Sequence, residues 1–145
     1  MPTQTVTRVV EADIEPERLY RFLAEASNIP QWAPVFADSI EHVSDAQYRV
    51  MKNGEIFTIE VLLHPSAYAV DYVRQMPGGR RGGAYIRVTP RSLGGSTITM
   101  TVPVGPNATG DAAGKILEQE LDDVVRLCAG WSVNSRTTPI AVSCD

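Results

Sequence analysis

Six strand-like runs follow one another between residues 39 and 104, separated only by short turns. The runs span 39–43, 46–52, 55–63, 67–75, 84–91 and 96–104. The breaks carry turn-forming residues: Ser44-Asp45, Asn53-Gly54, Pro65-Ser66, Pro77-Gly78-Gly79 and Gly94-Gly95. Asn53-Gly54 is the strongest hairpin signal, because a type I′ turn needs positive φ at both central residues. Connections this short leave no room for crossover helices, so the sequence predicts an antiparallel sheet.

The residues before these runs predict one further strand and two short helices. Residues 4–12 are β-branched and roughly alternate in polarity, which is typical of a strand. A proline flanked by acids at 15–17 is typical of a helix start, and apolar residues then recur at helical spacing, which predicts a helix over 16–26. Ser27 or Asn28 is expected to cap a second short helix.

The last strand and the segment after it predict how the sheet is covered. In 96–104 threonines alternate with apolar residues, so one face is expected to be wet and the other covered. Over 111–130 an apolar stripe steps by three or four, which predicts a helix about 30 Å long. Asp111 and Gly130 are its expected N-cap and C-cap. The stripe consists of Ala113, Leu117, Leu121, Val124, Cys128 and Trp131.

This order of elements predicts an α+β fold. A seven-stranded curved antiparallel sheet is expected to wrap around the long C-terminal helix, with the two short helices after the first strand. A single helix does not fill such a concavity, so an apolar cavity open at one end is expected.

Length, charge and cysteine usage exclude several classes of protein. A chain of 145 residues fits about one domain, with enough buried surface for a core. Its net charge of −4 argues against nucleic acid as a partner. No apolar run is long enough to span a bilayer and residues 1–5 do not resemble a secretory signal, so a cytoplasmic protein is expected. We expect it to be a monomer or a homodimer. Cys128 and Cys144 form neither a disulfide framework nor a metal spacing.

Catalytic and cofactor motifs are missing from the sequence. It has no Gly-x-Ser-x-Gly elbow, and only His42 and His64 are available as histidine bases. Two isolated histidines do not make a zinc site, so no metal is expected. Gly114-Lys115 lacks the spacing of a phosphate-binding loop, and residues 78–83 lack the order of a dinucleotide fingerprint, so no cofactor is expected.

The order of elements and three local motifs resemble the helix-grip fold of the START and Bet v 1-like (SRPBCC) superfamily, in particular its polyketide cyclase/dehydrase branch. The motifs are the strand-to-helix entry at 10–20, the Asn-Ile-Pro-Gln-Trp-Ala-Pro turn at 28–34 and Gly-Gly-Ser-Thr at 94–97. The resemblance covers about 3–131 and implies a ligand-binding domain there, with 132–145 as a polar C-terminal tail. It implies a pocket mouth framed by 52–54, 76–83 and 105–110. Because this superfamily holds lipid carriers, receptors and aromatase-cyclases, it does not imply one ligand.

Polar side chains that face the cavity are the candidates for orienting a ligand. In 67–75, Tyr72 and Arg74 share one face and Asp71 lies on the other, and alternation leaves open which face is concave. Either Tyr72 and Arg74 bind a carbonyl or carboxylate, or Asp71 is a buried carboxylate. His42 shares a strand face with Ile40 and is a fourth catalytic candidate. The expected ligand-binding residues are Trp32, Phe36, Phe57, Ile59, Val61, Tyr72, Tyr85, Met100, Val102, Leu117 and Leu121.

The run Gly78-Gly79-Arg80-Arg81-Gly82-Gly83 is the most unusual segment. It is consistent with a flexible hairpin loop that carries two solubilising arginines. The functional alternative is a mobile gate at the cavity mouth, where Arg80 and Arg81 attract an acidic group of the ligand.

Three functions remain open at this point. The first is binding of a hydrophobic small molecule, lipid-like or polycyclic, in the cavity. The second is a cyclase or aromatase activity that positions a poly-β-ketone chain for aldol cyclisation and dehydration. The third is a protein-interaction module without a ligand. A cavity that holds several polar groups within reach of one another favours the enzyme, an apolar cavity favours carriage, and a collapsed cavity favours the interaction module.

Overall fold

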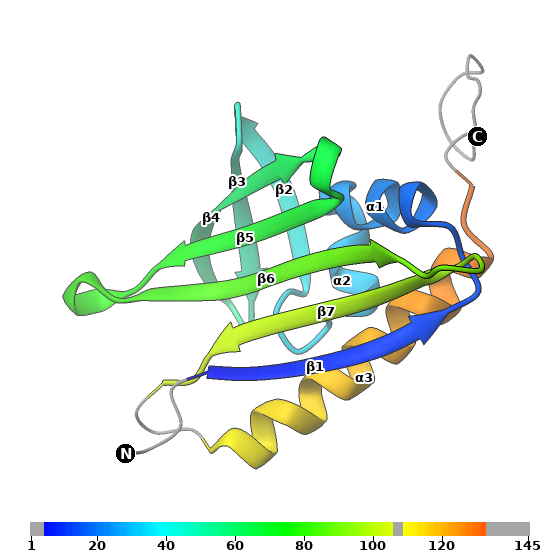
Figure 1. Cartoon of the computed structure of the whole chain (residues 1–145). Helices are drawn as coiled ribbons and strands as arrows, with labels where there is room; N and C mark the ends of the chain where they lie inside the picture. The colour runs from blue at the N-terminus through cyan, green and yellow to red at the C-terminus, as the bar shows by residue number, and fades with distance from the viewer. Residues whose placement is uncertain (1–4, 106–108, 133–145) are drawn as a thin grey trace.

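A curved antiparallel sheet holds a long helix against its concave side in the computed structural model, which describes residues 5–105 and 109–132 (Figure 1). Strand β1 (Thr5–Ala12) leads into α1 (Pro16–Ala24), the 3₁₀ turn Ala26–Asn28 and α2 (Ile29–Trp32). The other strands are β2 (Ser39–Ser44), β3 (Gln47–Lys52), β4 (Glu55–His64), β5 (Ala69–Gln75), β6 (Arg81–Pro90) and β7 (Ser96–Pro103). The last helix is α3 (Gly110–Ala129). The predicted α+β helix-grip architecture is confirmed.

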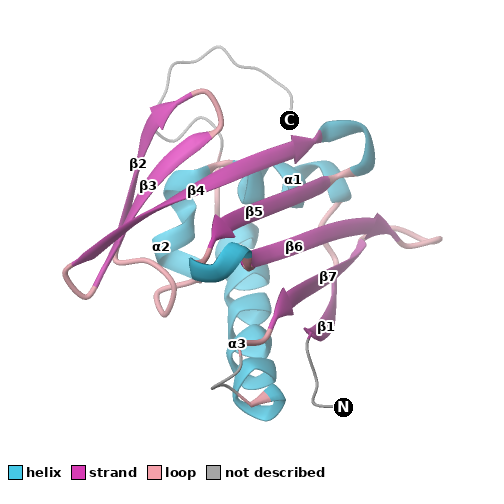
Figure 2. Cartoon of the chain, turned by 90° about the vertical axis from the view of Figure 1, so that its left-hand side faces the viewer, coloured by secondary structure: helices cyan, strands magenta, loops and turns pink. Residues whose placement is uncertain are grey.

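The seven strands form one sheet in the order β1-β7-β6-β5-β4-β3-β2, and every pair is antiparallel. Asn53 and Gly54 both have positive φ, 52° and 80°, as the type I′ turn requires. Strands β2 and β3 run steeply across the direction of β6, so the sheet bends around its contents (Figure 2).

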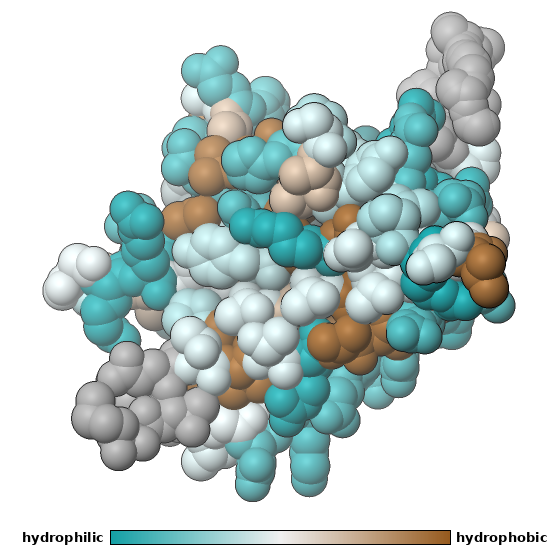
Figure 3. Space-filling model, in the orientation of Figure 1, coloured by the Kyte–Doolittle hydropathy of each residue, from teal (hydrophilic) through white to brown (hydrophobic). Residues whose placement is uncertain are grey.

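The core lies between the concave face of the sheet and the three helices. Ile98 and Met100 are fully buried, as their alternation with threonines predicts, and Leu117, Leu121 and Val124 of α3 face the same core. Each such side chain stabilises the fold by about 1.5–3 kcal/mol relative to exposure. The outer face of β5–β7 is mostly hydrophilic or neutral (Figure 3).

Contacts at both ends of α3 fix its position. Its N-cap is Thr109, whose hydroxyl accepts from the backbone N–H of Ala112, so the expectation of Asp111 is wrong. The helix begins at Gly110, which places Asp111 in the first turn, where the helix dipole favours a carboxylate. Gly130 is the C-cap, as expected. At the same end of the helix, Arg18 of α1 donates to the carbonyl oxygens of Cys128 (3.0 Å) and Trp131.

Four further details complete the fold. Strand β6 begins at Arg81 rather than at residue 84, so half of the glycine-rich run is strand. Tyr68, expected in the fifth run, has left-handed φ (51°) and lies just before β5. Cys128 is buried, and burial raises the pKa of its thiol to about 11. Among the helices described, none is long and apolar enough to cross a membrane.

Candidate functional site

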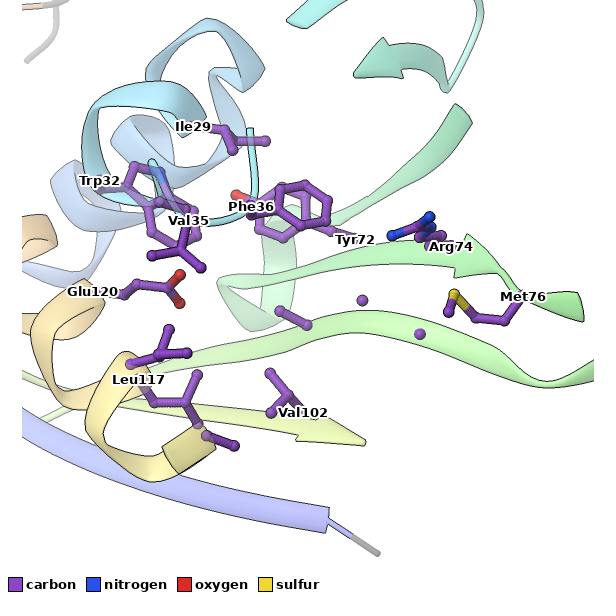
Figure 4. Close-up of a pocket in the computed structure, with 16 residues that line it drawn as sticks. Ile29, Trp32, Val35, Phe36, Tyr72, Arg74, Met76, Val102, Leu117 and Glu120 are labelled. Carbon is purple, nitrogen blue, oxygen red and sulfur yellow. The ribbon is translucent and has the colours of Figure 1, made fainter. Parts of the chain in front are cut away.

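A pocket of about 330 Å³ lies between α2, α3 and the concave face of β5–β7 (Figure 4). This volume is at the small end of the range that ligand sites occupy, roughly 300–1,000 Å³. All but two of the lining residues, Arg74 and Glu120, are apolar, aromatic or glycine. The segment from α2 onward contributes Ile29, Trp32, Ala33, Val35 and Phe36. The sheet contributes Tyr72, Arg74, Gly82, Gly83, Ala84 and Val102, and the turn after β5 contributes Met76. Helix α3 contributes Ala113, Ile116, Leu117 and Glu120.

The pocket stays open because its wall on β6 carries almost no side-chain volume. Gly82, Gly83 and Ala84 stand opposite Arg74, Val73 and Tyr72 in the β5–β6 ladder. Small residues on the facing helices leave further space, at Ala33 after α2 and at Ala113 on α3. The glycine-rich run therefore contributes the floor of the pocket as well as a hairpin.

The Tyr72 face of β5 is the concave one. Tyr72 is 3% exposed and its ring centroid lies 5.9 Å from that of Trp32. Asp71 lies on the outer face, where its carboxylate accepts from Arg87 at 2.7 Å and lies 3.5 Å from His64. Asp71 is buried, at 9% exposed, but beneath side chains of the outer face, so the alternative that it lies on the concave face is wrong.

Tyr72 contributes its ring to the pocket, while its hydroxyl is already engaged. The hydroxyl donates to the carbonyl oxygen of Leu23 at 2.5 Å, which satisfies a carbonyl in the last turn of α1. Burial raises the pKa of Tyr72 far above its usual value near 10. The phenol therefore stays neutral, and its proton serves the fold rather than a reacting group.

Arg74 places a positive charge at one end of the pocket. Its guanidinium carbon lies 3.6 Å from the centre of the Phe57 ring, a cation–π contact, and Phe57 in turn meets Phe36 edge-on at 5.5 Å. Within residues 5–105 and 109–132, no carboxylate forms an ion pair with Arg74. Its charge is available to a carboxylate or a polarised carbonyl of a ligand.

Glu120 is the functional candidate that the sequence-based prediction missed. It lies on α3 at the opposite end of the pocket from Arg74 (Figure 4). Burial, together with the negative charge of Asp123, raises the pKa of Glu120 to about 7. The signal was present, because Glu120 follows Leu117 by three residues and precedes Val124 by four, and therefore interrupts the apolar stripe.

Only some of the predicted ligand-binding residues line this pocket. Trp32, Phe36, Tyr72, Val102 and Leu117 do, whereas the other six do not. Ile59, Val61, Met100 and Leu121 are buried in the core, and Phe57 lies behind Arg74. Tyr85 alternates with core-facing Ile86, which places it on the outer face of β6.

The side chains of His42, Arg80 and Arg81 lie away from the pocket, although Met76, Gly82 and Gly83 of the expected mouth line it. His42 is exposed near the end of the β2–β3 hairpin, where its Nε2 donates to the carbonyl of Asp45 at 2.9 Å. Arg80 and Arg81 are exposed at the β5–β6 hairpin and neither lines the pocket. Residues 106–108 of the expected mouth, and 133–145 of the expected tail with Cys144, lie outside the described residues. No group of three or more potential metal ligands occurs within the described part of the chain.

The fold agrees with a comparison against known families. The model of the family "Polyketide cyclase / dehydrase and lipid transport" matches residues 3–129, nearly the whole chain. The chain belongs to this family. A search of curated proteins gave no significant match to this family member.

Solved structures similar to this member of the polyketide cyclase/dehydrase and lipid transport family show the same fold. A protein from Mesorhizobium loti is 17% identical with a TM-score of 0.68, covering 90% of this chain and 100% of its own. A START superfamily protein from Mycobacterium smegmatis is 15% identical with a TM-score of 0.62, covering 86% and 93%. The Zhui aromatase/cyclase from Streptomyces sp. R1128 is 16% identical with a TM-score of 0.61, covering 87% and 93%.

Proposed function

We propose that this protein binds a hydrophobic small molecule, lipid-like or polycyclic, in the pocket between the sheet and α3. The observation that carries the proposal is an unfilled volume of about 330 Å³ whose lining is almost entirely apolar, aromatic or glycine. Its wall offers aromatic rings from Trp32, Phe36 and Tyr72. Apolar surface removed from water contributes about 25 cal/mol per Å², which supplies the driving force for an apolar guest.

The rim of the pocket gives such a guest a way in. Val35 and Ile116 line the pocket, and they are 60% and 38% exposed. Residues that line the pocket and are also exposed to solvent mark its opening. The opening therefore lies between the turn after α2 and the first half of α3.

A second candidate function, aldol cyclisation and dehydration of a poly-β-ketone, is favoured by one observation. The pocket contains a cation that is able to stabilise an enolate oxygen, Arg74, and a carboxyl group with a pKa near neutrality, Glu120. Arg74 and Glu120 lie at opposite ends of the pocket (Figure 4), and the Tyr72 hydroxyl is bonded to Leu23. Because the polar groups are dispersed, binding without chemistry is the better-supported function.

Filling the pocket tests the proposal. Ala84→Phe places a ring in the pocket from a strand position that suits aromatic residues. We expect the affinity for the fluorescent probe N-phenyl-1-naphthylamine, measured by titration of its emission, to fall at least tenfold, because the ring occupies the volume that the probe needs.

Thr89→Phe is the matched control, because Thr89 is exposed on the outer face of the same strand. It is expected to leave the affinity unchanged. Equal affinity of both variants and the parent protein, or no binding of the probe by the parent protein, would contradict the proposed function.

A further inference from the structure

The guanidinium of Arg74 is a positive charge in the wall of the pocket without a negative partner. Within residues 5–105 and 109–132, Arg74 donates no hydrogen bond from its side chain and forms no ion pair. Its guanidinium carbon lies over the Phe57 ring, 3.6 Å from the ring centre. A contact with the face of a ring uses none of the guanidinium N–H groups, so these donors remain available to a ligand.

The register of the sheet directs Arg74 toward the pocket. Arg74 stands opposite Ile59 in the β4–β5 ladder, and Ile59 is buried in the core, so both side chains lie on the concave face. Arg74 lines the pocket itself, and Figure 4 shows it at one end of the pocket. This end of an otherwise apolar pocket is therefore cationic.

The sheet splits beside Arg74. Ile59 and Arg74 are the last pair of the β4–β5 ladder, and β4 continues past the end of β5 (Figure 2). A second hollow of about 300 Å³ lies at this split, and its lining is Gln47, Phe57, Thr58, Ile59, Glu60, Val73, Arg74 and Gln75. Because Arg74 borders both the apolar pocket and this more polar hollow, an anion bound to it avoids part of the cost of desolvation in a wholly apolar site.

The acidic residue of this hollow does not neutralise Arg74. Glu60 alternates with Ile59 and Val61, which are buried, so its side chain belongs to the outer face of β4. The other charged residue of the pocket wall, Glu120, lies at the opposite end (Figure 4).

A carboxylate is the chemical group that suits Arg74 best. The planar guanidinium presents pairs of N–H donors that match the two oxygens of a carboxylate, and such charge-assisted hydrogen bonds are about twice as strong as neutral ones. A carbonyl or hydroxyl oxygen accepts a hydrogen bond but leaves the positive charge unbalanced. We propose that the pocket selects an apolar ring compound that carries a carboxylate, with the rings against the apolar wall and the carboxylate on Arg74. This inference rests on the proposed binding function and adds the charged group that the ligand carries.

The two charged residues of the pocket set the conditions of the test. An ionised Glu120 repels a carboxylate, which favours the orientation with the carboxylate at the Arg74 end. The Glu120 carboxyl, with its pKa of about 7, is mostly protonated at about pH 6. A carboxylic acid ligand is ionised there, because free carboxyl groups titrate near pH 4. At about pH 6 the charge of Arg74 therefore dominates the pocket.

The experiment compares two naphthalenes of nearly the same shape that differ in charge. Isothermal titration calorimetry at about pH 6 measures the dissociation constants of 2-naphthoate and of 2-naphthamide, its neutral amide. We expect the parent protein to bind 2-naphthoate about tenfold more tightly, because the carboxylate forms charge-assisted hydrogen bonds with Arg74 and the amide forms neutral ones.

Arg74→Met keeps a long apolar side chain and removes the charge and the N–H donors. The preference for 2-naphthoate is expected to fall at least tenfold in this variant. Arg81→Met is the matched control, because it changes the net charge equally at an exposed position of β6 that does not line the pocket. It is expected to keep the tenfold preference. Circular dichroism and a melting curve show that both variants are folded.

The outcomes separate the two proposals. Equal binding of both naphthalenes by the parent protein, or an equal fall of the preference in Arg74→Met and Arg81→Met, overturns the carboxylate inference and leaves the binding function intact. An unchanged preference in Arg74→Met, or binding of N-phenyl-1-naphthylamine without binding of 2-naphthoate, has the same consequence. Failure of both naphthalenes and of N-phenyl-1-naphthylamine to bind the parent protein overturns the binding function and this inference with it.

Discussion

Replacing Gly83 with alanine is expected to lower the free energy of unfolding by about 3 kcal/mol or more. Gly83 has a φ of +113°, and a Cβ atom added there lies 1.8 Å from the backbone carbonyl oxygen of Tyr72. Because the obstacle is backbone rather than a flexible side chain, β5 and β6 have to separate at the floor of the pocket. The strain of the backbone conformation adds to the cost of this clash.

Urea denaturation followed by circular dichroism measures this loss. Gly79→Ala is the matched control, because Gly79 also has positive φ (+77°) but has open space around its Cβ position. Its expected cost is that of the left-handed conformation alone, about 1–2 kcal/mol. A Gly83→Ala variant no less stable than Gly79→Ala would show that the close approach of β5 and β6 does not exist.

The second large effect is a pH-dependent stabilisation on removing the charge of Glu120. The pKa of this carboxyl is raised from an ordinary value of 4.5 to about 7, so the folded protein binds a proton there that the unfolded chain has lost. The stability contributed by this proton is fully present below about pH 4.5 and is lost as pH rises through about 7. The difference between these two pKa values corresponds to a change of at most about 3 kcal/mol in the free energy of unfolding.

Glu120→Gln keeps the shape of the side chain and has no proton to lose. We therefore expect the variant to match the parent protein near pH 4.5 and to exceed its free energy of unfolding by up to about 3 kcal/mol above pH 7. Urea titrations at several pH values give the free energy of unfolding of both proteins. The difference between the two values at each pH removes the contributions of the other titrating groups. Asp122→Asn, from the exposed side of α3, is the control and is expected to give a flat difference curve.

A constant difference between Glu120→Gln and the parent protein over this range would mean that Glu120 is solvated like an ordinary carboxylate. The pocket wall at that end would then be wet rather than apolar.

The architecture is predictable from the sequence because it is recorded in local patterns. Alternation with period two marks Ile98 and Met100 as inward-facing, and the steps of three and four mark the buried stripe of α3. The Asn53-Gly54 turn likewise depends on two adjacent residues. These patterns need no knowledge of which elements meet.

The face of β5 is not predictable in this way, since both of its faces carry polar and apolar residues. Asp71 is satisfied on the outer face by Arg87 of the neighbouring strand, a pairing fixed by the register of β5 with β6. The pocket is not predictable from the sequence either. It exists because the small residues Gly82, Gly83 and Ala84 leave space between elements that meet only in the folded protein.

Glu120 is an intermediate case. Its place in the stripe of α3 is visible in the sequence, and a glutamate at a core-facing helical position is a signal for a buried carboxyl. The sequence does not show whether the Glu120 carboxyl faces a cation or a pocket, because this depends on the tertiary structure. In the structure it faces the pocket, and the cation of Arg74 lies at the opposite end.

An experiment with the two tryptophans as internal reporters tests most sharply whether the apolar pocket accepts a ligand. Trp32 lines the pocket, whereas Trp131 is not among the lining residues. Trp131 packs against Phe22, with 5.5 Å between the two ring centroids. A ¹H–¹⁵N correlation spectrum resolves their indole N–H signals, which Trp131→Phe assigns. On titration with N-phenyl-1-naphthylamine, the Trp32 signal is expected to shift to saturation while the Trp131 signal stays in place. A stationary Trp32 signal, or equal shifts of both signals, would show that the probe does not bind in the pocket beside Trp32.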